Sequence, residues 1–218
     1  MEYVRLSQRI LAKELRFFEK KAKKIYFTRK NKLFSKIKSD SKVLEIGPGT
    51  GVNFIHYPKK IFLNVIEPNS LFREDLMNKA NKFGFKFNFI LGSSERLPFK
   101  NDTFDFVVST LVLCSVKDLE KSLKEIKRVL KNEGKFIFVE HVIDKKNRLR
   151  KSIQDIATYF PCRFFGDGCR PNRDIGKTIK RVFSNVKINN YYQTGLGFFG
   201  YIIKSHISGV AVKSERFK

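Results

Sequence analysis

The chain has 218 residues, of which 23 are phenylalanine, and its 45 Lys and Arg against 21 Asp and Glu give a net charge of +24. This length allows one domain with a sizeable core, while no apolar run is long enough to cross a bilayer and no secretory signal opens the chain. The three cysteines, Cys114, Cys162 and Cys169, have neither disulfide nor metal-ligand spacing. We therefore expect free thiols, no bound metal and a cytoplasmic protein.

The positive charge is large enough to attract RNA, DNA or an anionic membrane surface. It comes mostly from lysine, however, in a chain also rich in asparagine, isoleucine and phenylalanine, and such a mixture is typical of an AT-rich genome. Basic residues recur along the whole chain, for example at Lys59-Lys60 and Lys180-Arg181, without an RNA-recognition signature. Nucleic-acid binding remains an alternative that the charge alone does not favour.

Residues 1–38 are predicted to form an N-terminal helical region ahead of a domain over residues 39–218. Apolar residues recur within 1–27 at rough helical spacing among many basic ones. This basic amphipathic helix has two interpretations: it packs over the domain and covers the ligand site, or it lies on an anionic membrane with its apolar side among the acyl chains. Both hold if the helix covers a cavity while it touches the membrane.

From residue 39 onward, strand patterns alternate with helix patterns. Strands are predicted over 43–46, 61–66, 86–91, 104–109, 135–141, 186–188 and 208–212; helices begin at 52 and span 69–83 and 119–130, and the segment after His141 is irregular. This alternation predicts a doubly wound α/β domain with a Rossmann-like, seven-stranded sheet. Ligands of such sheets bind beyond the carboxyl ends of the strands, beside the first one.

The glycine-rich loop after the first strand is the strongest ligand signal. Gly47, Gly49 and Gly51 let the backbone take positive φ and approach a ligand closely. The helix predicted to begin at Val52 would offer free N–H groups to an electron-rich ligand. Glu67 closes the next apolar run, twenty residues after Gly47, a spacing that suits a carboxylate bound to both ribose hydroxyls. Loop and carboxylate together predict a nucleotide-type cofactor.

The pattern Glu45-x-Gly47-x-Gly49-x-Gly51 resembles motif I of the class I S-adenosylmethionine-dependent methyltransferases. Gly92 to Phe99 is similar to their G-D-A-E-x-L-P-F segment, with Ser93 in place of the aspartate, and Arg128 to Gly134 is similar to R-V-L-K-P-G-G. The resemblance implies S-adenosylmethionine as cofactor and S-adenosylhomocysteine as product. The cofactor-binding residues that it implies are Glu45, Gly47, Pro48, Gly49, Thr50, Gly51, Asn53, Glu67, Pro68, Ser94, Glu95, Thr110 and Leu111.

Residues 28–213 also resemble a narrower group, the methyltransferase-like alkyl-thiol S-methyltransferases. The segments that carry this resemblance include 109–117, 139–142, 165–169 and 206–213. It implies methyl transfer to a small, apolar acceptor, with an alkyl thiol as the leading one. Members of that group associate with membranes through a hydrophobic N-terminus, whereas the N-terminus here is basic and amphipathic. A lipid or quinone O- or C-methyltransferase at a membrane surface and an RNA methyltransferase remain alternatives.

Three polar side chains are candidates for a base that assists the acceptor: Glu140, His141 and Asp167. Polar residues at strand ends also cap helices or bind backbone, so a structural role is the alternative for each. Cys114 and Cys169 are interpreted as small apolar fillers or walls of the acceptor cavity. Phe160, Phe164 and Phe165, with the N-terminal helix, are predicted to line the acceptor cavity.

Overall fold

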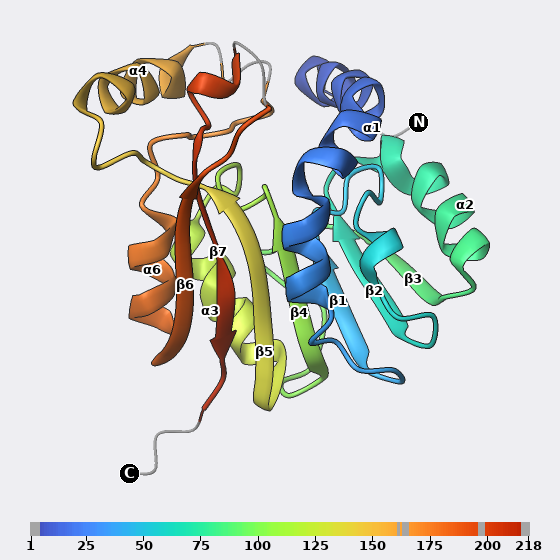
Figure 1. Ribbon diagram of the computed structural model, residues 1–218. Coiled ribbons are helices and arrows are strands. Elements are labelled where there is room, and N and C mark those ends of the chain that lie inside the picture. The colour runs from blue at the N-terminus through green and yellow to red at the C-terminus, as the bar shows by residue number, and fades with distance from the viewer. Residues whose placement is uncertain (1–4, 161, 163–165, 196–198, 215–218) are drawn as a thin grey trace.

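The computed structural model describes residues 5–160, 162, 166–195 and 199–214. It is a single seven-stranded sheet with helices on both faces (Figure 1). In chain order the elements are α1 (Leu6–Phe34), β1 (Lys42–Ile46), η1 (Phe54–His56), β2 (Phe62–Glu67), η2 (Ser70–Phe72), α2 (Arg73–Phe83), β3 (Lys86–Leu91), β4 (Phe104–Thr110), α3 (Leu119–Val129), β5 (Leu130–His141), α4 (Arg148–Tyr159), α6 (Ile175–Val182), β6 (Asn185–Tyr192), η3 (Phe199–Tyr201) and β7 (Ser205–Val212).

The strand order is β3-β2-β1-β4-β5-β7-β6. All neighbouring pairs from β3 to β5 are parallel, and β7 runs antiparallel to both β5 and β6. From β1 the chain first adds β2 and β3 on one side, and it then crosses back to add β4 and β5 on the other side of β1. This arrangement creates a crevice beyond the carboxyl ends of β1 and β4, the place where ligands bind in such sheets. The predicted doubly wound sheet is confirmed.

Residues of β1 face the two sides of the sheet alternately, as the period of a strand requires. Leu44 and Ile46 pack in a core that α3 and α6 cover, whereas Val43 packs in a second core shared with α1 and α2. Because both faces are covered, the buried positions of β1 are apolar except for one. Glu45 is that exception, and its side chain lies on the face of the second core with 1% of its surface exposed.

Two sequence-based predictions of local structure were wrong. The segment after His141 is not irregular, because α4 and α6 lie within it. Both helices begin with a capping side chain: the Asn147 side chain accepts from Arg150 N, and the Asp174 side chain accepts from Lys177 N. Such caps satisfy free N–H groups of the first turn and are a signal that the sequence carries.

The second correction concerns the segment after the glycine loop. Residues 52–57 form a turn followed by the short 3-10 helix η1, not the start of an α-helix. Pro58 disfavours the helical conformation at Tyr57 and ends the segment. The space over this face of the sheet is occupied by α1, whose Phe34 ring lies 5.0 Å from the Tyr57 ring. The glycine loop therefore leads into a turn and the three-residue η1.

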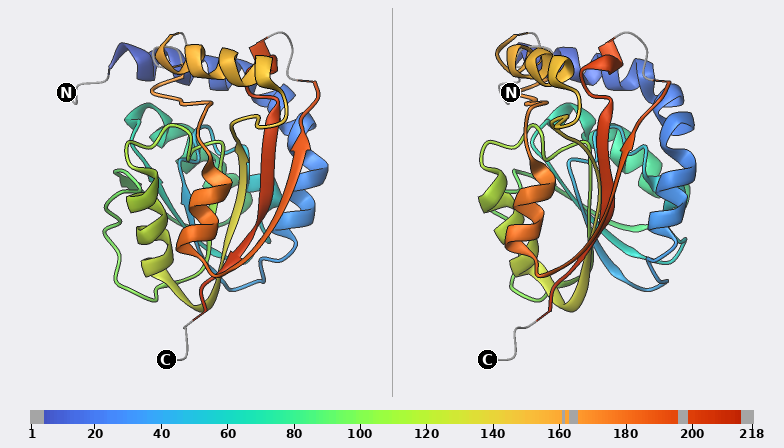
Figure 2. Two further views of the ribbon diagram at one scale, coloured as in Figure 1. Left: turned by 90° about the vertical axis from the view of Figure 1, so that its left-hand side faces the viewer. Right: turned by 60° about the vertical axis from the view of Figure 1, so that its left-hand side comes forward.

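The N-terminal helix α1 has two parts with different positions. Its first half lies across the carboxyl-terminal edge of the sheet, at the same end of the molecule as α4, and its second half runs down one face of the sheet (Figure 2). The second half contributes Tyr26, Leu33 and Phe34 to the core beside β1. Phe17 on the first half is 81% exposed. None of the helices in the described part of the chain is long and apolar enough to cross a membrane.

Candidate active site

The glycine loop after β1 has a backbone that only glycine adopts readily. Gly47 has φ +58°, and a Cβ there would lie 2.7 Å from a methyl group of Val112. Gly49 has φ +54°, and its nearest neighbour in the direction of a Cβ is Leu15 of α1. Any larger residue would be strained at these φ values and would fill the cradle between the loop and its neighbours.

Glu67 ends β2 and points its carboxylate at this loop. The carboxylate accepts hydrogen bonds from the backbone N–H groups of Gly49 (3.1 Å) and Asn69 (3.0 Å). Burial raises the pKa of Glu67 to about 7, against the lowering effect of these two hydrogen bonds. A carboxylate has acceptor capacity for about four hydrogen bonds, so two remain for a ligand.

A cavity of about 660 Å³ lies beside Gly49 and Glu67, within the range of small-molecule sites. The first half of α1 closes it on one side through Leu11, Glu14 and Leu15. Of the predicted site residues, those that line the cavity are Gly47, Gly49, Glu67, Pro68, Leu111, His141 and Asp167. The glycine cradle, the carboxylate and the cavity volume fit a nucleoside cofactor with room for a small second molecule.

Glu45 supports the loop from below. Its carboxylate accepts hydrogen bonds from the Asn53 side chain (2.6 Å) and the Tyr57 hydroxyl (2.9 Å). The same Asn53 amide also donates to the Thr110 hydroxyl at 2.8 Å, and thereby connects the glycine loop to the ends of β1 and β4. Burial raises the pKa of Glu45 to about 7. The four side chains of this network position the loop and do not line the cavity, and neither do Pro48, Thr50 and Gly51.

Ser94 and Glu95 hold the loop after β3 against the start of α3. The Ser94 hydroxyl donates to the Ser122 hydroxyl (2.9 Å), and the Glu95 carboxylate accepts from the backbone N–H of Lys117 (2.7 Å). Neither residue lines the cavity. Their side chains therefore fix the position of the loop beside the cavity.

Glu140, near the end of β5, is fully buried and holds the loop that follows β4. Its carboxylate accepts hydrogen bonds from the Ser109 hydroxyl (2.7 Å) and from the backbone N–H groups of Val112 (3.0 Å) and Leu113 (3.2 Å). Burial raises the pKa of Glu140 to about 8. This carboxylate lies behind the cavity wall, so it reaches the cavity only through the loop that it positions.

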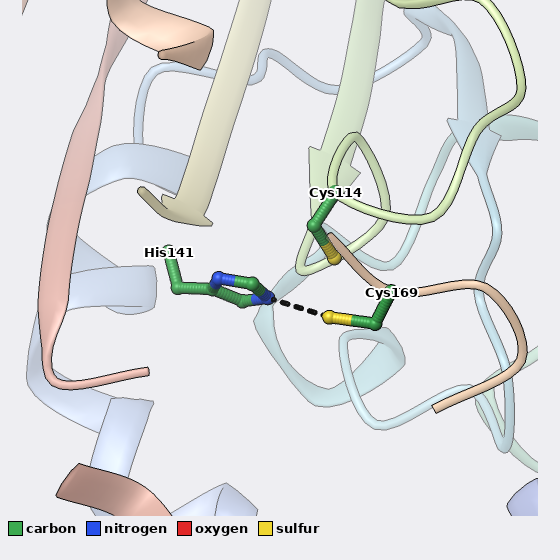
Figure 3. A group of neighbouring side chains, drawn as sticks. All are labelled: Cys114, His141 and Cys169. Carbon is green, nitrogen blue, oxygen red and sulfur yellow. Dashed lines mark hydrogen bonds between the residues drawn. The ribbon is translucent and has the colours of Figure 1, made fainter. Parts of the chain in front are cut away.

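His141 faces the cavity beside two thiols, an arrangement that the sequence spacing did not indicate. Its Nε2 lies 3.4 Å from Cys169 Sγ, and the Cys114 thiol lies next to both groups (Figure 3). Burial lowers the pKa of His141, but Cys114 and Glu140 outweigh this effect and leave the pKa above its ordinary value. Nδ1 of His141 is buried without a hydrogen-bond partner among the described residues.

Asp167 connects α1 to the rim of the cavity. Its carboxylate accepts a hydrogen bond from the Ser7 hydroxyl (2.8 Å) and pairs with Arg5 at 3.2 Å.

Phe160 does not line the cavity and is 63% exposed, whereas Phe164 and Phe165 lie outside the described residues. The sequence-based prediction missed Phe72, Ile202 and Ile203, which are apolar wall residues. Only Phe72 had a signal, because it follows Glu67 closely in the chain.

The strand order is that of the class I S-adenosylmethionine-dependent methyltransferases, and the comparisons show that the chain is an enzyme of this class. A family model described as a methyltransferase domain matches residues 44–138. An S-adenosylmethionine-dependent methyltransferase of Thermotoga maritima has the same fold, with a TM-score of 0.65 and 20% identity over 95% of this chain and 100% of that chain.

Curated relatives narrow the assignment. Human thiol S-methyltransferase TMT1A is 34% identical over 85% of this chain and 79% of its own length. Mouse thiol S-methyltransferase TMT1B is 33% identical over 85% of this chain and 79% of its own length. The chain belongs to the family of these thiol S-methyltransferases. The predicted cofactor and reaction class are confirmed.

Proposed function

We propose that this protein transfers a methyl group from S-adenosylmethionine to a small, apolar thiol. The observation that carries the proposal is that Gly49, Glu67 and His141 all line one and the same mostly apolar cavity. Both groups needed for a transfer, a nucleoside-binding carboxylate and an acceptor wall, thus border the same space. The names of the curated relatives supply the acceptor class.

The bound cofactor supplies a methyl group activated by a sulfonium sulfur. In our proposal the Glu67 carboxylate accepts hydrogen bonds from both ribose hydroxyls, and the side-chain-free backbone at Gly47 and Gly49 lets the amino-acid portion lie close to β1. Leu111, beside Gly47 across the crevice, would lie under the methionine portion. Ser94 and Glu95 would keep the adenine-side loop in place through their hydrogen bonds to α3.

The remaining wall suits an apolar acceptor. Its apolar side chains come from α1, from the end of η2 and from the segment before β7: Leu11, Leu15, Phe72, Ile202 and Ile203. A thiol needs little help to react, because a few per cent of it is thiolate at neutral pH. We assign His141 and Asp167 to this acceptor end, and Glu140 to positioning the loop between β4 and α3.

Mass spectrometry of methyl transfer to a mixed panel of alkyl thiols, phenols, amines, quinols and RNA tests this function. We expect methylated alkyl thiols only, with S-adenosylhomocysteine formed in equal amount. Methylation of a quinol, an amine or RNA in preference to every thiol would overturn the acceptor assignment. At S-adenosylmethionine concentrations below saturation, the variant Glu67→Ala should reduce transfer to the same thiol by roughly 10- to 150-fold, whereas Glu74→Ala, at an exposed position on α2, should leave it unchanged.

We further propose peripheral contact with an anionic membrane through the first half of α1. Exposed apolar side chains support this second proposal: Phe17 and Phe18 on α1, and Ile156 and Tyr159 on α4, which lies at the same end of the molecule (Figure 2). Arg16 precedes the two phenylalanines, and Lys20 and Lys21 follow them after Glu19, which suits anionic headgroups. Nucleic-acid binding remains a prediction from the charge alone.

Flotation with vesicles that contain anionic lipid tests the membrane proposal. The double variant Phe17→Ser/Phe18→Ser should lose most vesicle binding and keep its fold, because both side chains are at least half exposed. A matched control is Met77→Ser, which changes an exposed apolar residue on α2. Equal flotation of the double variant, the control and the unmodified chain would refute the contact through α1.

A further inference from the structure

Two thiols and an imidazole converge at the acceptor end of the cavity. Cys114 lies in the loop after β4, His141 ends β5, and Cys169 follows α4 in the chain. The two sulfur atoms and a histidine ring nitrogen all lie within 4.8 Å of one another. In Figure 3, Nε2 of His141 points towards the Cys169 sulfur, with the Cys114 sulfur beside it. Three segments distant in sequence thus present three metal-ligand atoms to one point.

We propose that Cys114, His141 and Cys169 bind one Zn²⁺ ion, whose fourth coordination position faces the cavity and takes the sulfur of the acceptor. All three residues line the same cavity as Gly49 and Glu67. Three protein ligands and one open position characterise catalytic zinc sites, whereas structural sites have four protein ligands. The zinc site itself depends only on these side chains; its use for the acceptor rests on the proposed thiol methyl transfer.

The separation of one donor pair matches a tetrahedral ion. With Zn–S near 2.3 Å and Zn–N near 2.0 Å, a sulfur and a nitrogen on the same zinc lie about 3.5 Å apart. Cys169 Sγ and His141 Nε2 are separated by 3.4 Å. A thiol–imidazole hydrogen bond would account for this one distance, but it does not require the second sulfur, that of Cys114, which lies within 4.8 Å of both groups.

The donor set selects the class of metal. Thiolate and imidazole ligands favour zinc over the hard cations magnesium and calcium, which prefer oxygen ligands. Two thiolates also neutralise the two charges of the ion, so the complex adds no net charge to a mostly buried, apolar site. Cys114 is buried, and His141 is 4% exposed. Burial therefore does not oppose the metal as it would oppose an unpaired ion.

Hydrogen bonds outside the cluster hold the two cysteine segments together. The backbone N–H of Arg170 donates to the Cys114 carbonyl (3.0 Å), and the Arg173 guanidinium donates to the Leu113 carbonyl (2.8 Å). On the other side, the Glu140 carboxylate accepts from Leu113 N. The segments that carry Cys114 and Cys169 are thus joined without help from a metal, and Glu140 links them to the strand that ends in His141. Such support keeps metal ligands in position.

Zinc would activate the acceptor by lowering the pKa of its thiol, because a coordinating thiol is deprotonated. The proton leaves to solvent as the sulfur binds the ion. The acceptor sulfur then uses an electron pair to form a bond to the methyl carbon, while the bond from that carbon to the sulfonium sulfur breaks and its electrons stay with the cofactor product. The methylated acceptor is a neutral thioether, a weaker ligand than a thiolate, which favours its release.

Metal content is the first test and does not depend on catalysis. The full chain is treated with a chelator, reloaded with Zn²⁺ and passed through a desalting column, and bound zinc is then measured by mass spectrometry. We expect one zinc per chain. The variants Cys114→Ser, His141→Gln and Cys169→Ser should each bind zinc at least about tenfold more weakly, as removal of a ligand predicts. A chain that retains no zinc would overturn the proposal.

Cys162 provides the matched control. It also lines the cavity and interacts with Cys169, but it does not belong to the group of three converging ligands. We expect Cys162→Ser to keep its zinc. Loss of zinc in this variant would show a closed site with four protein ligands and would overturn the open position. Because a serine at the buried Cys114 can destabilise the fold, thermal unfolding of every variant is measured in parallel.

Cobalt substitution tests the same site without any variant. Co²⁺ bound by two thiolates should give a sulfur-to-metal charge-transfer band, and an alkyl thiol added without S-adenosylmethionine should increase and shift that band. An unchanged spectrum would refute binding of the acceptor at the metal. If the band responds to the thiol but no thiol is methylated, the metal site stands and the proposed function fails. If a chain free of zinc methylates thiols, the proposed function stands and the role of the metal fails.

Discussion

The backbone N–H of Gly49 donates a hydrogen bond of 3.1 Å to the carboxylate of Glu67, so the cofactor loop and the predicted ribose ligand are one connected unit. Gly49 lies in the loop after β1 and Glu67 ends β2, and these two strands pair in parallel. A change at either residue therefore disturbs both the shape of the loop and the carboxylate that faces the cavity.

The first prediction concerns the carboxylate. Glu67→Ala should weaken S-adenosylmethionine binding by about 1.5–3 kcal/mol, the value of hydrogen bonds to a charged group, or roughly 10- to 150-fold in the dissociation constant. Isothermal titration calorimetry measures this change. Glu74→Ala on the exposed side of α2 serves as control, and an unaltered dissociation constant for Glu67→Ala would remove the ribose assignment.

The second prediction concerns the shape of the loop. Gly47→Ala should lose cofactor affinity and thermal stability, because φ is +58° and the new methyl group would lie 2.7 Å from a methyl group of Val112. Gly84→Ala is the matched control: φ is +70°, but no atom lies within 4 Å of its Cβ position. It has the backbone strain, about 1–2 kcal/mol, without the clash.

A double variant separates strain from clash at Gly47. Adding Val112→Ala to Gly47→Ala removes the two methyl groups that the new Cβ would meet. Part of the lost cofactor affinity should return, while the strain remains. Calorimetry of the single and double variants decides the point; no recovery in the double variant would mean that the backbone conformation alone requires glycine.

The third prediction concerns pH. Burial raises the pKa of Glu67 to about 7, and only its ionised form can accept hydrogen bonds from both ribose hydroxyls with full strength. Affinity for S-adenosylmethionine should therefore be present above pH 7 and fall as the pH decreases through about 7. Dissociation constants measured across this range test the sign. Glu67→Gln should flatten the profile, and an equally steep profile in that variant would assign the pH dependence to Glu45, whose pKa is also raised to about 7.

The fourth prediction concerns the support below the loop. Asn53→Ala removes the amide that donates to both Glu45 and Thr110 and leaves a buried carboxylate with one partner fewer. The free energy of unfolding should decrease by about 1–3 kcal/mol, the cost of an unsatisfied buried group. Asn88→Ala, which removes a hydrogen bond between exposed side chains, should change it by less than about 0.5 kcal/mol. Thermal unfolding distinguishes the two; equal losses would contradict a supporting role for Asn53.

The success of the sequence-based predictions followed the strength of the local pattern. The strand predicted over 86–91 has the bounds of β3, because Gly84, which ends α2, and Gly92 limit this apolar run on either side. The helix predicted from Val52 failed, because Pro58 and the packing of α1 against Tyr57 limit that segment to η1. The helices α4 and α6 were missed although Asn147 and Asp174 cap them, because they are short, with 12 and 8 residues.

The sequence by itself determined the individual strands of the sheet, the glycine loop and the carboxylate of Glu67. Each of these depends on residues close in the chain or on a fixed spacing. Only the tertiary structure decided that Glu45, Asn53 and Glu140 support the site from behind, and that α1 closes the cavity. It also brought Cys114, His141 and Cys169 to one point, although up to 55 residues separate them. No local pattern encodes such a meeting. The parallel strands β4 and β5 bring Cys114 and His141 to the same edge of the sheet, and the segment between α4 and α6 returns Cys169 to that edge.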